Sequence, residues 1–171
     1  MKRVLKTAFV IGLLSTLLGA QGSARKPIEG IWEVTEIVIT GADASNVPNP
    51  QPSLVIFTPR HYSIMYVWGS QPRKPYTAEV PTNAEKLAAF DSFVASSGTY
   101  DLTGTTLTLH PIVARNPGFM AGGFDKYQFR IDGTTLSLTN KSTDFNFRKG
   151  DRVGPSTAPL SETRLKLVRV E

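Results

Sequence analysis

Residues 129–138 read Phe-Arg-Ile-Asp-Gly-Thr-Thr-Leu-Ser-Leu, two short alternating runs on either side of a glycine. The Asp132-Gly133 pair favours a tight β-hairpin turn, because both turn positions tolerate a positive φ angle. Residues 100–109 read Tyr-Asp-Leu-Thr-Gly-Thr-Thr-Leu-Thr-Leu and repeat this pattern. The two stretches therefore predict two antiparallel hairpins.

A period of two extends through most of the chain. Further strands are predicted over 31–39, 53–58, 61–68 and 162–170, with loops rich in proline and glycine at 41–52, 69–81 and 112–123. In residues 31–39, simple alternation places Trp32, Val34, Glu36 and Val38 on one face. The segment 140–161 is irregular, although Phe145 and Phe147 alternate inside it as in a short strand. About eight or more short strands predict an all-β antiparallel barrel or sandwich, and periodicity alone does not choose between them.

One segment has helical character instead. Residues 82–85 fit a capping box, with Thr82 as N-cap and Glu85 reaching back to it. A helix of about three turns is predicted from this point. Its apolar residues share one stripe, which Gly98 closes: Leu87, Phe90, Phe93 and Val94.

The first 24 residues have the pattern of a secretory signal peptide. A basic start at residues 2–6 precedes an apolar run over 8–18 and small residues over 19–24. The run is shorter than the roughly 20 residues that cross a bilayer. We therefore expect residues 1–24 to be a signal peptide that is cleaved after Ala24 or after Ala20, rather than an uncleaved anchor, with no stable membrane insertion afterwards. Residues 25–171 are then a single periplasmic or secreted domain.

Composition limits the functional classes. The chain has no cysteine, so disulfides and thiol chemistry are excluded. Three of its 19 lysines and arginines, but none of its 14 acidic residues, lie in residues 1–24, which leaves a net charge of +2 on residues 25–171. Without a long basic run, nucleic acid is not an expected partner.

Several short motifs resemble the bacterial and fungal lipocalin-like domain family. Gly30-Ile31-Trp32 is similar to the G-x-W that opens the first strand of lipocalin-type barrels, and residues 54–63 resemble the family's strand, T-P-x-x-Y, strand segment. The order of loop, helix and hairpins that follows is also similar over about residues 28–171, except in 140–160. The resemblance implies a lipocalin-like barrel with a cavity, and it implies little about activity.

The resemblance also implies a structural pair at the barrel floor. In lipocalins the G-x-W tryptophan packs against an arginine of the last strand, which here would be Trp32 with Arg169, or with Arg164. Stacking of a guanidinium on an indole ring stabilises by about 0.5–2 kcal/mol.

The predicted interior is rich in aromatic side chains. Tyr62, Tyr66 and Trp68 share one strand face and either line a ligand cavity or pack as plain core. The other candidates for the lining are Tyr100, His110, Tyr127 and Phe129. Parity suggests that Phe129 faces inward and Arg130 outward. Arg115 could bind a carboxylate if it points inward.

No cofactor or metal is expected. The two histidines, His61 and His110, lie on different predicted strands and belong to no metal-binding motif. His61 directly follows a turn and is expected to be exposed. The chain also lacks a serine nucleophile elbow and the phosphate-binding and dinucleotide-binding fingerprints.

Three hypotheses for function follow. The favoured one is an exported barrel that binds a small apolar molecule, which predicts an apolar cavity without convergent titratable groups. The second is an isomerase or cyclase that uses His110 and a tyrosine as an acid–base pair, so that His110 faces inward near Tyr66 or Tyr100. The third is a solid barrel that acts through its surface, which predicts a filled interior.

Overall fold

The computed structural model describes residues 25–42 and 44–171. The predicted signal peptide at 1–24 lies outside these residues. Among the helices of the described part, none has the length and apolar character needed to cross a membrane.

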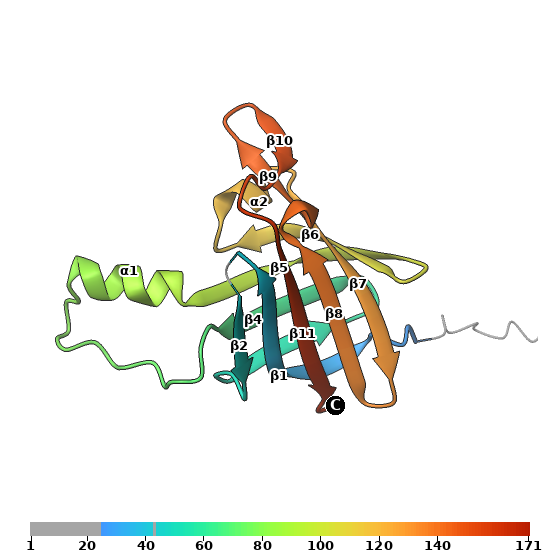
Figure 1. Cartoon of the computed structure of the whole chain (residues 1–171), viewed down its shortest axis with the longest axis horizontal. Coiled ribbons are helices and arrows are strands. Elements are labelled where there is room, and N and C mark those ends of the chain that lie inside the picture. Colours follow the sequence, from blue (N-terminus) through green and yellow to red (C-terminus); the bar gives the residue numbers. More distant parts are fainter. Residues whose placement is uncertain (1–24, 43) are drawn as a thin grey trace, which may run out of the picture.

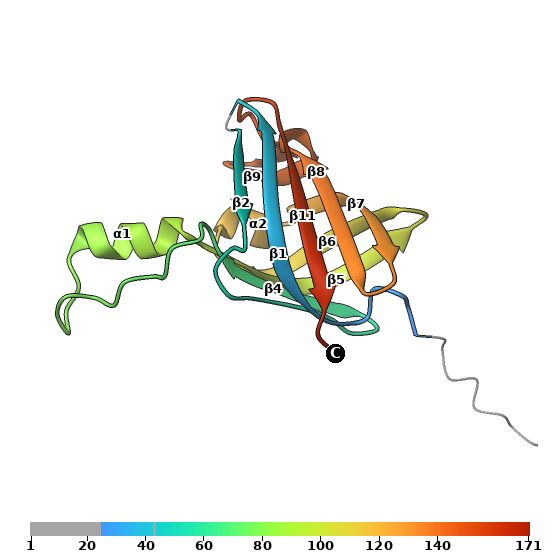
Figure 2. The same ribbon diagram turned by 60° about the horizontal axis from the view of Figure 1, so that its bottom comes forward.

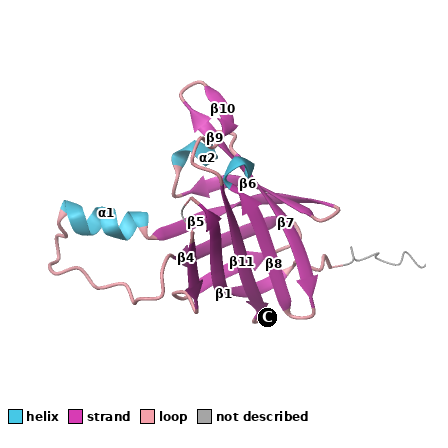
Figure 3. Cartoon of the chain, viewed as in Figure 1, coloured by secondary structure: helices cyan, strands magenta, loops and turns pink. Residues whose placement is uncertain are grey.

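Eight antiparallel strands close into a barrel (Figures 1 and 3), which confirms the predicted fold class. Around the ring they are β1 (Gly30–Gly41), β3 (Ser53–Phe57), β4 (His61–Val67), β5 (Phe93–Thr103), β6 (Thr106–Ala114), β7 (Phe124–Asp132), β8 (Thr135–Lys141) and β11 (Ser161–Arg169). Pairing of β8 with both β7 and β11 completes the ring. Closure leaves these strands without free edges along most of their length.

Smaller elements gather at one end of the barrel, the upper end in Figure 1. They are helix α2 (Pro117–Met120), the 3-10 turn η1 (Ser142–Asp144) and the hairpin of β9 (Phe145–Lys149) and β10 (Arg152–Pro155). β9 pairs with the start of β7, so the segment 140–160 continues the sheet beyond the barrel. Strand β2 (Ser45–Pro48) pairs with β1 inside the stretch predicted as a loop.

The two predicted hairpins are confirmed. β5 and β6 turn at Gly104, and β7 and β8 turn at Gly133, with φ angles of 58° and 56°. These positive angles suit glycine, which has no Cβ to clash with the neighbouring carbonyl.

Strand β1 does not alternate uniformly, so the predicted face assignment is wrong beyond Val34. The register shifts between Val34 and Glu36, where a bulge inserts an extra residue. The bulge turns Ile37, rather than Glu36, into the core, and Ile37 is fully buried. A hydrophobic side chain at Ile37 gains burial only because of this shift.

Helix α1 (Asn83–Asp91) begins as predicted, and the capping box of Thr82 and Glu85 is confirmed. The predicted end at Gly98 is wrong, because Phe93 already begins strand β5 and pairs with Val67 of β4. α1 buries no residue and projects from the barrel with Phe90 half exposed (Figures 1 and 2). Phe93 and Val94, at the end of the predicted helical stripe, therefore belong to the sheet.

Gly98 is required by close packing between β5 and β6. A Cβ at this position would overlap the carbonyl oxygen of His110, beside the bulge that shifts the register. We expect Gly98→Ala to lower the free energy of unfolding by about 1–3 kcal/mol, the usual cost of overpacking. Urea unfolding measures this loss. Gly154→Ala is the control, since nothing lies within 4 Å of a Cβ there, and an equal loss in both variants would contradict the packing argument.

The floor of the barrel, opposite the upper end, is closed by Trp32 and Arg169. The Arg169 guanidinium lies 4.1 Å from the Trp32 ring centroid, and its Nη2 donates to the Pro27 carbonyl at 2.6 Å. The Trp32 indole Nε1 donates to the Ile28 carbonyl at 2.8 Å, and the ring is fully buried. Above this pair lies a packed core that includes Ile28, Val55, Phe57, Leu107, Leu136, Leu138 and Leu167.

Candidate functional site

The interior is hollow near the upper end. A pocket of about 290 Å³, here called the upper pocket, lies between the barrel strands, α2 and the β9–β10 hairpin. It is lined by Tyr66, Trp68, Val94, Ala95, Ser96, Ala114, Arg115, Asn116, Phe119, Asp125, Tyr127, Asn140, Phe145, Phe147, Ser156, Thr163 and Leu165. The interior is thus filled toward the floor and open above, which a solid barrel would not be.

Aromatic rings make up much of the lining. On one side the rings of Tyr66 and Trp68 meet edge to face with centroids 5.4 Å apart. On another side Phe119 of α2 contacts Phe145 and Phe147 of β9, with centroids 6.4 and 5.5 Å away. Pockets for small molecules are typically apolar in this way, with a few polar groups that orient the ligand.

Asp125 is the acidic group of the upper pocket. It follows Phe124 at the start of β7, where strand parity places it on the inward face with Tyr127. Only 7% of Asp125 is exposed, and its Oδ1 has no hydrogen-bond partner among the described residues. Burial raises the pKa of this carboxyl from 3.8 to about 7, because a low-dielectric surrounding disfavours the charged form.

Asn140 is a second buried polar group without a partner. It ends the inward row Leu136, Leu138, Asn140 of β8 and is 2% exposed. Burial raises the pKa of the nearby Tyr127 hydroxyl, and the Asn140 amide opposes this rise. Neither Asn140 amide atom, however, makes a hydrogen bond of good geometry with the described residues. Leaving buried polar atoms unpaired costs about 1–3 kcal/mol each, so such groups commonly mark a site for a ligand or water.

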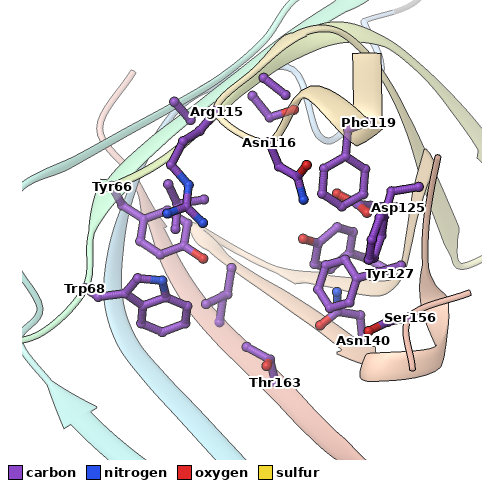
Figure 4. A pocket seen from close by; sticks show the side chains of 17 residues that line it. Tyr66, Trp68, Arg115, Asn116, Phe119, Asp125, Tyr127, Asn140, Ser156 and Thr163 are labelled. Carbon is purple, nitrogen blue, oxygen red and sulfur yellow. The ribbon is translucent and has the colours of Figure 1, made fainter. Parts of the chain in front are cut away.

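Two tyrosine hydroxyls point into the upper pocket from opposite sides (Figure 4). They belong to Tyr66 of β4 and Tyr127 of β7, and burial raises the pKa of both above the usual value, with the nearby Asp125 carboxylate adding to the rise. Both therefore stay protonated at neutral pH and can donate or accept a hydrogen bond.

Arg115 lies on the α1 side of the upper pocket. Its Nη1 donates to the Phe90 carbonyl at 2.8 Å, and its guanidinium lies 4.8 Å from the Phe90 ring centroid. Figure 4 shows it beside Tyr66, on the opposite side of the view from Asp125. The helix end thus holds this positive charge at the edge of the pocket.

The sequence candidates divide between the pocket and the core. Tyr66, Trp68 and Tyr127 line the upper pocket, and so does Arg115. Tyr62 and Tyr100 lie in the core with their hydroxyls bonded to Ser96 Oγ at 2.6 Å and to the Thr58 carbonyl at 2.7 Å. These two residues stabilise the fold and do not line the pocket.

The other two candidates, Phe129 and His110, also lie outside the pocket. Phe129 packs against the core, while the Arg130 side chain is 81% exposed, in agreement with their parity. The prediction that His110 faces inward as an acid–base residue is wrong. His110 lies on the outer face, where its Nε2 is 3.0 Å from Asp101 Oδ2. It shares strand parity with Thr106 and Thr108, opposite the buried Leu107 and Leu109.

Sequence reasoning missed Asp125 and Asn140, although a signal was present. In residues 124–131, the inward positions are Asp125, Tyr127, Phe129 and Ile131, so an acidic residue occupies the apolar side of an alternating strand. The contribution of Phe119, Phe145 and Phe147 had no such signal, since it depends on how α2 and β9 fold over the barrel end.

The residues present do not suggest a metal centre. In the described ranges, no three His, Cys, Asp or Glu side chains come together in a way that would hold a metal ion.

No protein-family model matches the chain, and no curated protein is similar enough in sequence to count as a relative. The chemistry of the upper pocket is therefore the guide to function.

Proposed function

We propose that this chain is an exported, lipocalin-like binding protein that holds a small, largely apolar molecule in the upper pocket. The observation that carries this proposal is the half-filled barrel, in which a pocket of about 290 Å³ lies above a packed core. That volume lies just below the usual range for ligand pockets, about 300–1,000 Å³. The ligand is therefore compact.

Export is part of the proposal and rests on the amino-acid sequence of residues 1–24. The basic start, the short apolar run and the small residues that follow are typical of a signal peptide. The absence of cysteine is compatible with an oxidising compartment, where free thiols are reactive.

Filling the upper pocket is expected to abolish binding. Ala114 lines the pocket at the end of β6, so Ala114→Trp would occupy part of the space that a ligand needs. We expect the wild-type domain to bind the neutral dye N-phenyl-1-naphthylamine with a saturable fluorescence increase. The Ala114→Trp variant should bind it at least ~10-fold more weakly, a loss of about 1.4 kcal/mol.

Val113→Trp provides the matched control, because Val113 is the neighbouring residue and is 61% exposed. It should bind the dye like the wild type. Equal dye binding by all three proteins would place the dye outside the pocket and remove the main support for the proposed function.

An isomerase or cyclase is the second candidate. The binding hypothesis predicts a cavity without convergent titratable groups, whereas Asp125, Tyr66 and Tyr127 all line the upper pocket, so Asp125 favours the enzyme in place of His110. A buried carboxyl with a pKa of about 7 is suited to exchange a proton at neutral pH. The Tyr66 and Tyr127 hydroxyls are donors that could polarise a bound carbonyl. A candidate ligand that is recovered chemically unchanged after prolonged incubation with the wild-type protein would favour binding over catalysis.

A further inference from the structure

Building on the proposed binding function, we propose that the upper pocket takes a compact primary amine with an apolar, preferably aromatic body. In the complex the protonated amine forms an ion pair with the Asp125 carboxylate. The rest of the molecule packs between the aromatic rings of the pocket. This proposal names the chemical class of ligand.

The first support is the missing partner of Asp125. Of the described residues that line the pocket, Asp125 alone is acidic, and its Oδ1 is buried without a hydrogen bond. A carboxylate in a low-dielectric site is strongly unfavourable unless a cation or several donors compensate it. No arginine, lysine or histidine within the described ranges forms an ion pair with it. A cationic ligand supplies the ion-pair partner that Asp125 lacks.

The second support is the number and kind of neighbouring acceptors. An ammonium group has three N–H donors and no acceptor. Figure 4 places Asp125, Tyr127 and Asn140 on one side of the pocket. One oxygen of the Asp125 carboxylate and the Asn140 amide oxygen are buried there without a hydrogen-bond partner in the described part of the chain, and the Tyr127 hydroxyl oxygen is a third possible acceptor. A primary amine can use all three, whereas a neutral hydroxyl has a single donor.

The third support is the aromatic lining. A cation near the face of a tyrosine or tryptophan ring is attracted by the negative face of the ring. Tyr66, Trp68 and Tyr127 are of this kind, and Phe119 and Phe147 add further rings. A pocket of about 290 Å³ is large enough for an aromatic ring with a short chain.

The charges that face Asp125 are few, so its ionisation controls the pH response of binding. The titratable groups facing it are Tyr127 on its own strand and Tyr62 and Tyr66 on β4, all of which stay protonated at neutral pH. Arg115, after β6, is held by the Phe90 carbonyl at the pocket edge. The lining residues contributed by β5, α2, β8, β9 and β11 are uncharged.

Binding of the amine should weaken as the pH falls. With a free-state pKa of about 7 for Asp125, about one carboxyl in a hundred is ionised at pH 5 but about nine in ten at pH 8. A protonated carboxyl cannot form the ion pair, and the amine itself stays charged throughout this range. The Kd is therefore expected to rise about 90-fold between pH 8 and pH 5.

The test is isothermal titration calorimetry with 2-phenylethylamine and, as its neutral counterpart, 2-phenylethanol. The wild-type domain should prefer the amine by at least ~10-fold at pH 8, and that preference should disappear at pH 5. Asp125→Asn should bind both compounds alike at either pH. Asp132→Asn is the matched control, because Asp132 lies on the same strand with its side chain 82% exposed, and it should behave like the wild type.

The outcomes separate the ligand class from the binding function. If N-phenyl-1-naphthylamine binds but the amine has no advantage over the alcohol at pH 8, the amine inference is overturned and the binding function stands. If the dye also fails to bind, both are overturned. The pH dependence of the wild-type protein decides the matter even if Asp125→Asn does not fold.

Discussion

Replacing Asp125 by asparagine is expected to stabilise the ligand-free barrel at pH 8, by up to about 4 kcal/mol. The carboxyl pKa rises from 3.8 to about 7 on folding because the buried site disfavours the charge. Each unit of pKa difference corresponds to about 1.4 kcal/mol between the folded and unfolded states. Asparagine has nearly the same shape and carries no charge, so it removes this penalty.

The sign and the pH range follow from proton linkage. The folded protein holds the Asp125 proton more tightly than the unfolded chain does, so raising the pH favours unfolding while only the unfolded chain has released its proton. This loss of stability begins near pH 4 and is complete above about pH 7, the two pKa values concerned. The advantage of Asp125→Asn should therefore be small at pH 4 and grow to its full size by pH 8.

Urea unfolding at pH 4, 6 and 8 measures this difference directly. Asp132→Asn removes an exposed carboxyl from the same strand and should leave the pH dependence unchanged. A variant that is less stable than the wild type by the same amount at every pH would show that the Asp125 carboxylate makes a stabilising contact. Stabilisation on removal of a buried charge would instead identify a residue retained for function at a cost in stability.

The barrel itself could be predicted from the sequence, because period-two alternation and glycine turns are local properties. The hairpins at Gly104 and Gly133 and the capping box at Thr82 could be located by their residues alone. The bulge in β1 could not, since the inward turn of Ile37 depends on pairing with β11 far along the chain. The predicted end of helix α1 was wrong for the same reason, because pairing of Phe93 with Val67 overrides the helical pattern of apolar residues.

The pocket could be predicted from the sequence only in part. Tyr66, Trp68 and Tyr127 can be predicted, because aromatic residues on an inward strand face are candidates for any interior. Whether they line a cavity or pack as core depends on how far the core fills the barrel, which is a property of the whole fold. Asp125 belongs to no sequence motif, and its only signal is that of an acidic residue among apolar neighbours on one strand face.

The two tryptophans of the chain are expected to separate stability from binding. Trp32 is fully buried at the floor and holds Arg169 in place, so Trp32→Ala should lower the free energy of unfolding by about 3–5 kcal/mol. Trp68 is only half-buried and lines the upper pocket beside Tyr66. Trp68→Ala should cost less stability but weaken binding of N-phenyl-1-naphthylamine by about 10-fold, or about 1.4 kcal/mol.

The milder Trp32→Phe variant provides the control, because it keeps an aromatic ring at the floor and leaves Trp68 as the sole tryptophan. It should retain the affinity of the wild type, and the emission of Trp68 should change when the pocket is occupied. Loss of dye affinity in Trp32→Phe with affinity retained in Trp68→Ala would move the binding site to the floor. We expect stability to depend mainly on Trp32 and dye affinity mainly on Trp68. This difference requires that the filled lower half of the barrel act as a scaffold, so that the open upper half can carry unpaired polar groups for its ligand.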